Sequence, residues 1–190
     1  QEHSMESFFG RVNYDFDNKY YLSASIRSDE SSKFHPDHRR GTFWSVGGSW
    51  RLTQEEFLKD VEWLSNLKLK ASYGTQGNDG ILDINGYKVN FPAYAATTMY
   101  ETLFDEWYIT GYGAVLKALG NKDLTWEKSK NLNIGLEAAF LNNRLKLETE
   151  YFLKKTSDML YNMPYPISSG ISYVPMNLLD MQNKGIEFTI

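Results

Sequence analysis

Apolar and polar residues alternate along seven segments of the chain, and this alternation predicts seven amphipathic β-strands. In the first segment, Phe8, Val12 and Phe16 fall on one face, whereas Arg11 and Asp15 fall on the other. Successive side chains of a strand point to opposite faces, so a period of two indicates a strand rather than a helix. The expected strands cover residues 8–16, 20–29, 44–52, 67–73, 126–140 and 145–153, and a seventh begins at residue 184.

Compact and long connections alternate between these strands. The compact ones cover residues 17–19, 53–66 and 141–143, and the long ones cover residues 30–41, 75–125 and 156–182. A capping-box pattern at Thr53–Glu56, followed by apolar residues at helical spacing, predicts one short helix in residues 53–66. The longest connection is expected to carry a small hairpin of its own.

These features predict an all-β fold, an antiparallel up-and-down meander of about seven strands that forms part of a large transmembrane β-barrel. Such barrels keep short turns at the periplasm and longer loops outside, so the compact connections, including the short helix, are expected on the periplasmic side. Tyr and Trp suit membrane interfaces, and the chain has 13 Tyr and 5 Trp. Four aromatic residues are expected near the periplasmic interface, namely Phe16, Tyr20, Trp63 and Phe140.

A soluble β-sandwich with one dry face also alternates apolar and polar residues. The rival hypothesis is therefore a soluble β-rich carbohydrate-binding or adhesion module. The expected inner faces carry more charge than the exterior of a sandwich requires, and this favours a hydrated barrel lumen. The charged residues on these faces are Arg11, Asp15, Arg27, Asp29, Arg51, Lys68, Lys70, Glu148 and Glu150.

Composition narrows the function classes further. The 190 residues carry a net charge of -4, which does not suggest a nucleic-acid partner. The sequence has no cysteine, and therefore no disulfide, thiol nucleophile or cysteine metal site. The start does not resemble a secretory signal, and the last residues, Glu187 to Ile190, continue a strand pattern. We therefore expect residues 1–190 to be a piece of a longer chain.

Candidate chemistry is sparse, so we expect neither an enzyme nor a bound metal or cofactor. His35-Pro36-Asp37-His38 is the one His-rich cluster, but the proline disfavours a helix that would present both imidazoles, and no third ligand is apparent. The acidic stretch that begins at Asn78 lacks the spacing of a calcium-binding loop. A nucleophile motif of the G-x-S-x-G type is absent from the sequence.

Two sets of residues are candidates for binding. The long loops carry aromatic and polar side chains that suit contact with a sugar, with a partner protein or with neighbouring loops. The lumen carries basic side chains that suit guidance of a solute, or pairing with other charges. The loop candidates are Asn78, Asp79, Tyr87, Tyr94, Tyr100, Trp107, Tyr108 and Tyr112, and the lumen candidates are Arg11, Arg27, Arg51 and Lys70.

An ordered set of short motifs resembles the barrel of SusC/RagA-like TonB-dependent outer-membrane transporters. Each motif is weak alone, but together they cover nearly the whole chain in the family's order. They are FGRVNY at 9–14, YLSASIR at 21–27, GTFWSV at 41–46, WLSNLKLKASYG at 63–74, NKDLTWE at 121–127, NIGL at 133–136, NNRL at 142–145, residues 151–159 and NKGIE at 183–187.

The resemblance implies a barrel of about 22 strands that encloses an N-terminal plug. It further implies location in the outer membrane of a Gram-negative bacterium, contact with outer-membrane lipid, energy from the TonB complex and a SusD-like lipoprotein as the outer partner. The implied cargo is a glycan, a peptide or another large nutrient. Residues 1–190 would be a partial barrel domain without plug, signal peptide or remaining strands.

Overall fold

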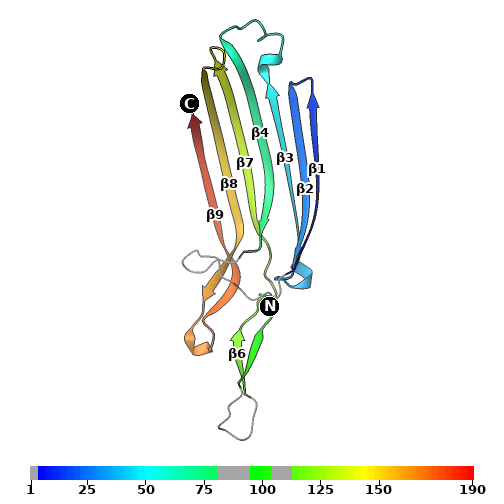
Figure 1. The fold of residues 1–190 in the computed structure, drawn as a ribbon. Helices are drawn as coiled ribbons and strands as arrows, with labels where there is room; N and C mark the ends of the chain where they lie inside the picture. Colours follow the sequence, from blue (N-terminus) through cyan, green and yellow to red (C-terminus); the bar gives the residue numbers. More distant parts are fainter. Residues whose placement is uncertain (1–3, 81–94, 104–112) are drawn as a thin grey trace.

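The computed structural model describes residues 4–80, 95–103 and 113–190, and seven of its strands form one curved sheet (Figure 1). All pairs are antiparallel, and the order β1-β2-β3-β4-β7-β8-β9 follows the chain. The predicted all-β meander is therefore confirmed. The strands are β1 (Met5–Phe16), β2 (Tyr20–Ser31), β3 (Arg40–Arg51), β4 (Leu64–Asn78), β7 (Glu127–Phe140), β8 (Leu145–Pro164) and β9 (Tyr173–Thr189).

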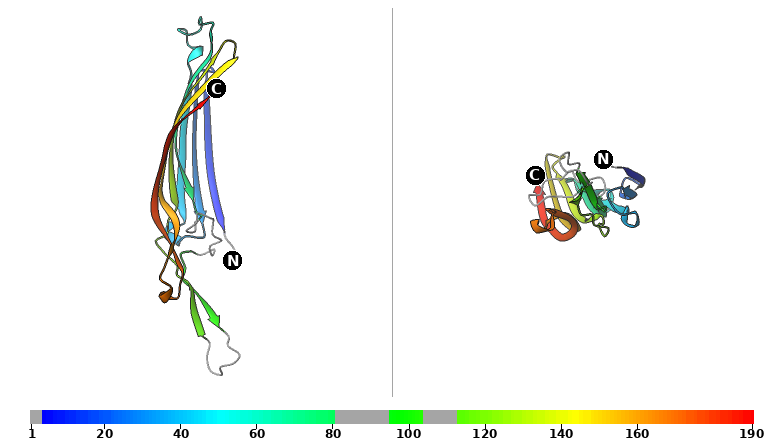
Figure 2. Two further views of the ribbon diagram at one scale, coloured as in Figure 1. Left: turned by 90° about the vertical axis from the view of Figure 1, so that its left-hand side faces the viewer. Right: turned by 90° about the horizontal axis from the view of Figure 1, so that it is seen from below.

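The strand register keeps apolar residues on one face across the sheet. Leu69 lies opposite Leu136, and Tyr73 lies opposite Leu132. The polar residues between them also align, as in the pair of Lys68 and Glu137. A shift by one residue would reverse the two faces, so this pattern specifies the register. The sheet is a single bowed layer (Figure 2), and its apolar face stays exposed, as it does in Ile26, Trp44, Ile134, Leu136, Ile186 and Phe188.

The compact turns and their aromatic residues gather at one end of the sheet. Asp17 and Asn18, in the three-residue turn between β1 and β2, both have positive φ, at 54° and 52°, and the amide of Lys19 closes the turn on the carbonyl of Phe16. The rings of Tyr20 and Trp50 stack with centroids 6.1 Å apart, and those of Trp63 and Phe140 stack at 5.9 Å. This end of the sheet is the one expected to lie at the periplasmic interface.

The opposite end carries two hairpins that extend past the wall of the sheet. One is the separate pair of β5 (Met99–Leu103) and β6 (Gly113–Ala118), which confirms the small hairpin predicted in the longest connection. The other is the outer half of β8 and β9, because the connection between these strands covers only residues 165–172. The predicted loop of residues 156–182 is therefore wrong. A β-bulge between Thr156 and Leu160 shifts the register there and interrupts the alternation that marks a strand.

The helix predicted in residues 53–66 does not form. The segment contains the 3-10 turn η2 (Leu52–Gln54) and successive turns that the amides of Glu55, Leu58 and Val61 close with carbonyls three residues earlier. The capping box does not form, because the Thr53 hydroxyl accepts a hydrogen bond from the amide of Leu67 rather than from the amide of Glu56. Two further 3-10 turns are η1 (Pro36–His38) and η3 (Ile167–Ser169). None of the helices in the described ranges is long and apolar enough to cross a membrane.

Glu55 holds this compact connection against the end of the sheet. Its Oε1 accepts hydrogen bonds from Tyr20 Oη at 2.7 Å and from Trp50 Nε1 at 3.0 Å. Lys19 Nζ lies 3.7 Å from the other carboxylate oxygen. These interactions favour the charged carboxylate, and the hydrogen bond from Tyr20 is the largest cause that lowers the pKa of Glu55 below its ordinary value.

We expect the Glu55→Gln variant to lose thermal stability at neutral pH but not in acid. A carboxylate with a lowered folded-state pKa stabilises the protein above its ordinary pKa, and this contribution disappears as the pH falls through the lowered value. Thermal melts of the detergent-solubilised protein at neutral pH and at about pH 3 test this. The exposed neighbour Glu56 supplies the control Glu56→Gln. A difference between wild type and Glu55→Gln that persists unchanged in acid contradicts the proposed role of the charge.

Candidate functional site

An apolar cluster joins the long connections at the outer end of the sheet. We define the outer cluster as Phe34, Phe43, Ala95, Leu124, Trp126 and Leu160, all of which are buried. Its members come from the β2–β3 connection, from β3, from the β4–β7 connection and from β8. Most of the remaining sheet is one exposed layer. The outer cluster therefore gives the long connections a common core that the wall itself does not need.

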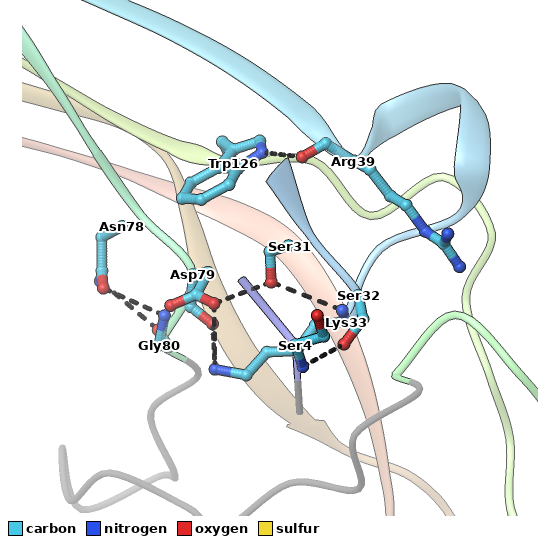
Figure 3. Close-up of polar contacts among 9 residues, drawn as sticks. All are labelled: Ser4, Ser31, Ser32, Lys33, Arg39, Asn78, Asp79, Gly80 and Trp126. Carbon is cyan, nitrogen blue, oxygen red and sulfur yellow. Dashed lines mark hydrogen bonds and ion pairs between the residues drawn. The ribbon is translucent and has the colours of Figure 1, made fainter. Parts of the chain in front are cut away.

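Trp126 lies at the centre of the outer cluster. Its ring contacts Phe34 and Phe43 at centroid distances of 5.3 and 5.6 Å. Its indole Nε1 donates a 2.8 Å hydrogen bond to the carbonyl of Arg39 (Figure 3). The Arg39 Nε in turn donates to the carbonyl of Phe34. Aromatic pairs with a satisfied polar group give both packing and orientation. Trp126 thus ties the β2–β3 connection to the start of β7.

A polar network continues from this cluster to the start of the longest connection (Figure 3). Ser31, fully buried, donates from Oγ to Asp79 Oδ2 at 2.9 Å. Lys33 Nζ lies 3.2 Å from the same carboxylate oxygen and donates to the Asp79 carbonyl at 3.1 Å. The Asp79 side chain therefore has partners at the end of β2 and on the β2–β3 connection, and this fixes where the chain leaves β4.

Asn78 and Glu127 extend the network to β8. Asn78 Nδ2 donates to Glu127 Oε1 at 3.3 Å, and the amide of Leu160 donates to Glu127 Oε2. On the far side of β8, Asn177 Oδ1 accepts from the amide of Thr125 at 3.0 Å, and Asn177 Nδ2 donates to the carbonyl of Thr125. The two ends of the β4–β7 connection are thus attached to three different strands.

The remaining loop candidates have little described structure. Tyr100 lies on β5 and is 67% exposed, so its side chain is available for contact. Asn78 and Asp79 are the two candidates that the network of Ser31, Lys33 and Glu127 brings together. Their role in binding a substrate or partner stays a prediction. The other five candidates lie outside the described residues, and they are Tyr87, Tyr94, Trp107, Tyr108 and Tyr112.

The lumen candidates lie on the polar face of the sheet and have different surroundings. Arg11 Nε donates to Asn13 Oδ1 at 3.2 Å, and Arg27 Nε pairs with Asp29 Oδ1 at 2.6 Å. The Arg51 guanidinium lies over the ring of Tyr21, 5.6 Å from its centroid. The polar face is hollowed into an open groove of about 630 Å³, lined by Asn13, Tyr21, Ser49, Lys70, Asn133 and other polar residues.

Lys70 is the centre of an ion-pair network on this face. Its Nζ lies 3.2 Å from Glu137 Oε1 and 3.4 Å from Glu150 Oε2, and it donates a short hydrogen bond to Glu148. Lys70 reaches β8 by crossing Gly135 on β7, where a Cβ atom would overlap the side-chain carbons of Lys70. Lys70, which was a candidate for guiding a solute, is therefore paired with three carboxylates.

The His-rich segment forms a surface turn. His35 Nδ1 lies 3.2 Å from Asp37 Oδ2, and η1 begins directly after His35. In the part of the chain that the structure describes, no three His, Asp or Glu side chains are grouped as a metal site requires. The geometry therefore offers two binding surfaces, the outer end with its joined loops and the polar groove.

Comparison with known proteins identifies the architecture. Residues 2–190 match the family model described as "TonB dependent receptor-like, beta-barrel". The chain belongs to the TonB-dependent receptor β-barrel family. Receptors of this family are located in the outer membrane of Gram-negative bacteria, which confirms the expected location. The family is one of transporters, which agrees with the expectation that the chain is not an enzyme. The rival hypothesis of a soluble binding module is wrong.

Sequence relatives place the chain among SusC/RagA-type TonB-dependent receptors. It is 34% identical to the TonB-dependent receptor SusC of Bacteroides thetaiotaomicron over 189 residues, which are 98% of this chain and 18% of SusC. It is 37% identical to the TonB-dependent receptor P3 of Formosa agariphila over 189 residues, which are 100% of this chain and 18% of that receptor. The chain thus spans about 18% of the length of these curated relatives.

Solved structures agree with this relationship. The RagAB peptide importer in its closed-closed state matches with a TM-score of 0.84 and 34% identity, over 99% of this chain and 19% of that one. The siderophore receptor PirA of Pseudomonas aeruginosa matches with a TM-score of 0.59 and 16% identity, over 98% of this chain and 30% of that one. The second match shows the shared fold alone.

The candidates predicted from the sequence omit several residues that hold the outer end together. Trp126, Glu127, Asn121 and Asn177 join the connections, yet none was named as a candidate. The available signal was the NKDLTWE motif at 121–127, which carried part of the family resemblance. In the structure this motif supplies the Trp126 core, the Glu127 bridge and the hydrogen bond from Asn121 Nδ2 to the Pro175 carbonyl.

Truncation of Trp126 should loosen the outer connections while the wall stays folded. Trp126→Ala removes a ring that is 3% exposed, and such changes cost about 3–5 kcal/mol of local stability. We expect faster cleavage of the long connections by added protease, with unchanged strand content by circular dichroism. Tyr100→Ala, which removes an exposed ring, is the control and should not change the cleavage rate. Equal protection of wild type and Trp126→Ala would show that the outer cluster does not anchor these connections.

Removal of the Lys70 charge should destabilise the wall. In Lys70→Met, Glu137 and Glu148 would face each other directly on neighbouring strands without their shared counter-ion, and opposed like charges are destabilising. We expect a lower urea midpoint, and partial recovery when Glu148→Gln is added to Lys70→Met. Lys154→Met, also on the polar face, is the matched control. A midpoint that Glu148→Gln lowers further would contradict the charge-balance explanation.

Proposed function

We propose that the chain forms a section of the wall and outer loops of a TonB-dependent importer for glycans or other large nutrients. In this proposal the plug, the signal peptide and the remaining strands belong to other parts of a longer protein. The observation that carries it is the match to the receptor family over residues 2–190, together with a sheet that has one apolar and one polar face. Energy for transport would come from the TonB complex through the full-length protein.

The wall has a simple part in this proposal. Its exposed apolar face contacts outer-membrane lipid, because a single-layer sheet has no second layer against which these side chains could pack. The polar face borders the lumen. There the charges of Arg27 and Lys70 are balanced by neighbouring carboxylates, whereas Arg11 and Arg51 have no carboxylate partner among the described residues. Arg11 and Arg51 are therefore the lumen residues best placed to meet a solute or the plug.

The outer end holds the long loops in place for capture of the cargo. The outer cluster and the Asp79 network attach both ends of the β4–β7 connection to the rim of the sheet. Such a rim suits a SusD-like lipoprotein that covers the receptor from outside. The similarity of this chain to the RagAB peptide importer supports a partner of this kind.

Two cargo classes are candidates, one supported by the sequence and one by a relative. Aromatic side chains among Asn, Asp and Glu in the long loop suit the stacking and hydrogen bonding that glycans require. The similarity to the RagAB peptide importer favours peptides as the second candidate. Growth of a strain that lacks the full-length receptor, tested separately on oligosaccharides and on peptides as limiting nutrient, distinguishes the two classes. Normal growth of this strain on both would contradict the importer proposal.

Alanine variants of the loop aromatics test their role in capture. The substituted residues are Tyr87, Tyr94, Tyr100, Trp107, Tyr108 and Tyr112. Loss of an aromatic anchor costs roughly 1 kcal/mol or more, so we expect uptake at limiting cargo to fall at least about fivefold with surface levels unchanged. Tyr165→Ala is the control, because Tyr165 is exposed in the β8–β9 connection. Unchanged uptake by the full set of variants would exclude these residues from substrate and partner contact.

A further inference from the structure

Four lysines gather on the outer surface of the wall beside the apolar band. Lys128 and Lys130 lie on β7, Lys155 on β8 and Lys184 on β9, and all four residues are exposed. Their strands are adjacent in the sheet. We define these residues as the lysine patch. They play no part in the outer cluster or in the Lys70 network.

The side of the sheet that the lysine patch occupies follows from its neighbours. Ser129 and Thr156 are buried, and their hydroxyls lie 2.9 Å apart in a hydrogen bond on the inner face. Side chains of adjacent strand residues point to opposite faces, so Lys128, Lys130 and Lys155 project outward. Lys184 pairs with Leu153 in the register, and Leu153 belongs to the apolar face.

The height of the patch places it at a membrane boundary. Leu132 and Leu153 are opposite each other and form the last apolar pair of the outward face on β7 and β8. The next outward pair is Lys130 and Lys155, about 7 Å further along the strands. Because the compact turns lie at the other end of the sheet, this boundary is the extracellular one. Lys128, Lys130 and Lys155 therefore lie at the level of the outer-leaflet headgroups, and Lys184, opposite Leu153, lies at the edge of the apolar band.

The patch has an unbalanced positive charge. Lys130 and Lys155 are directly opposite on neighbouring strands, an arrangement that costs stability when both are charged. Among the described residues none of the four lysines has an ion pair, in contrast to Lys68 and Lys70 on the inner face. The carboxylates of Asp158 and Asp180 lie further out along the hairpin, where Asp180 accepts from the amide of Asp158. No described carboxylate therefore neutralises the lysine patch, and an anion from outside the chain can supply the counter-charge.

We propose that the lysine patch binds the phosphate groups of phosphorylated glycolipids in the outer leaflet. Lysine ammonium groups bind phosphate as point charges, and basic clusters beside a membrane are attracted to anionic headgroups. A lipid fits better than a free anion because the patch borders the apolar band, so that acyl chains contact Leu132 and Leu153 while the phosphates contact the lysines. This site does not depend on the cargo or on the capping partner.

Binding of lipid A to the purified full-length receptor in detergent tests this proposal. The variant carries Lys128→Gln, Lys130→Gln, Lys155→Gln and Lys184→Gln, and we expect it to bind bisphosphorylated lipid A about tenfold more weakly than wild type. The control removes the same number of charges elsewhere and should bind as wild type does. The control residues, each replaced by Gln, are Lys59, Lys122, Lys146 and Lys154.

A second comparison needs no substitution. Wild type should bind dephosphorylated lipid A about tenfold more weakly than the bisphosphorylated form. Equal binding of the two lipids overturns the proposal, as does an equal loss in the patch and control variants. If the fourfold patch variant does not assemble, the pair Lys130→Gln and Lys155→Gln and the wild-type comparison decide. Loss of cargo uptake would not affect either result, so the two proposals fail independently.

Discussion

Backbone hydrogen bonding between neighbouring strands is the constraint on which this structure depends. In hydrocarbon, each amide and carbonyl needs a protein partner, and an antiparallel ladder supplies one without a second layer. The side chains are then free to differ between the two faces, apolar toward lipid and polar toward water. The period of two in the sequence, the bowed single layer and the exposed apolar residues are all consequences of this arrangement.

The wall was predictable because its signal is local and repeated. Residues such as Leu132, Ile134 and Leu136 alternate with polar neighbours over a whole strand, so no long-range knowledge is needed to assign them. The prediction failed where side chains find partners that the sequence does not reveal. The Thr53 hydroxyl accepts from the distant amide of Leu67 rather than capping a helix, and the bulge after Thr156 interrupts the alternation of the strand, so that the segment resembles a loop.

The candidate site was harder to predict for the same reason. Asn78 and Asp79 were recognisable as polar residues at the start of a long loop, but their partners Ser31, Lys33 and Glu127 lie far away in the sequence. In the sequence, Trp126 is one more aromatic residue of a predicted strand, but in the structure it lies at the centre of the buried outer cluster. Contacts between separate connections create the outer end, whereas periodicity reports only the contacts between a strand and its surroundings.

The crossing of Lys70 over Gly135 couples two neighbouring strands through a missing side chain. Because the lysine stem occupies the space of the absent Cβ, a side chain at the glycine would displace Lys70 from its carboxylate partners, so we expect the two positions to vary together. In related receptors, a larger residue at the glycine should accompany a shorter or neutral one at the lysine, together with fewer acidic residues on the next strand. A redesign of the charges that line the lumen would therefore have to change β4, β7 and β8 together.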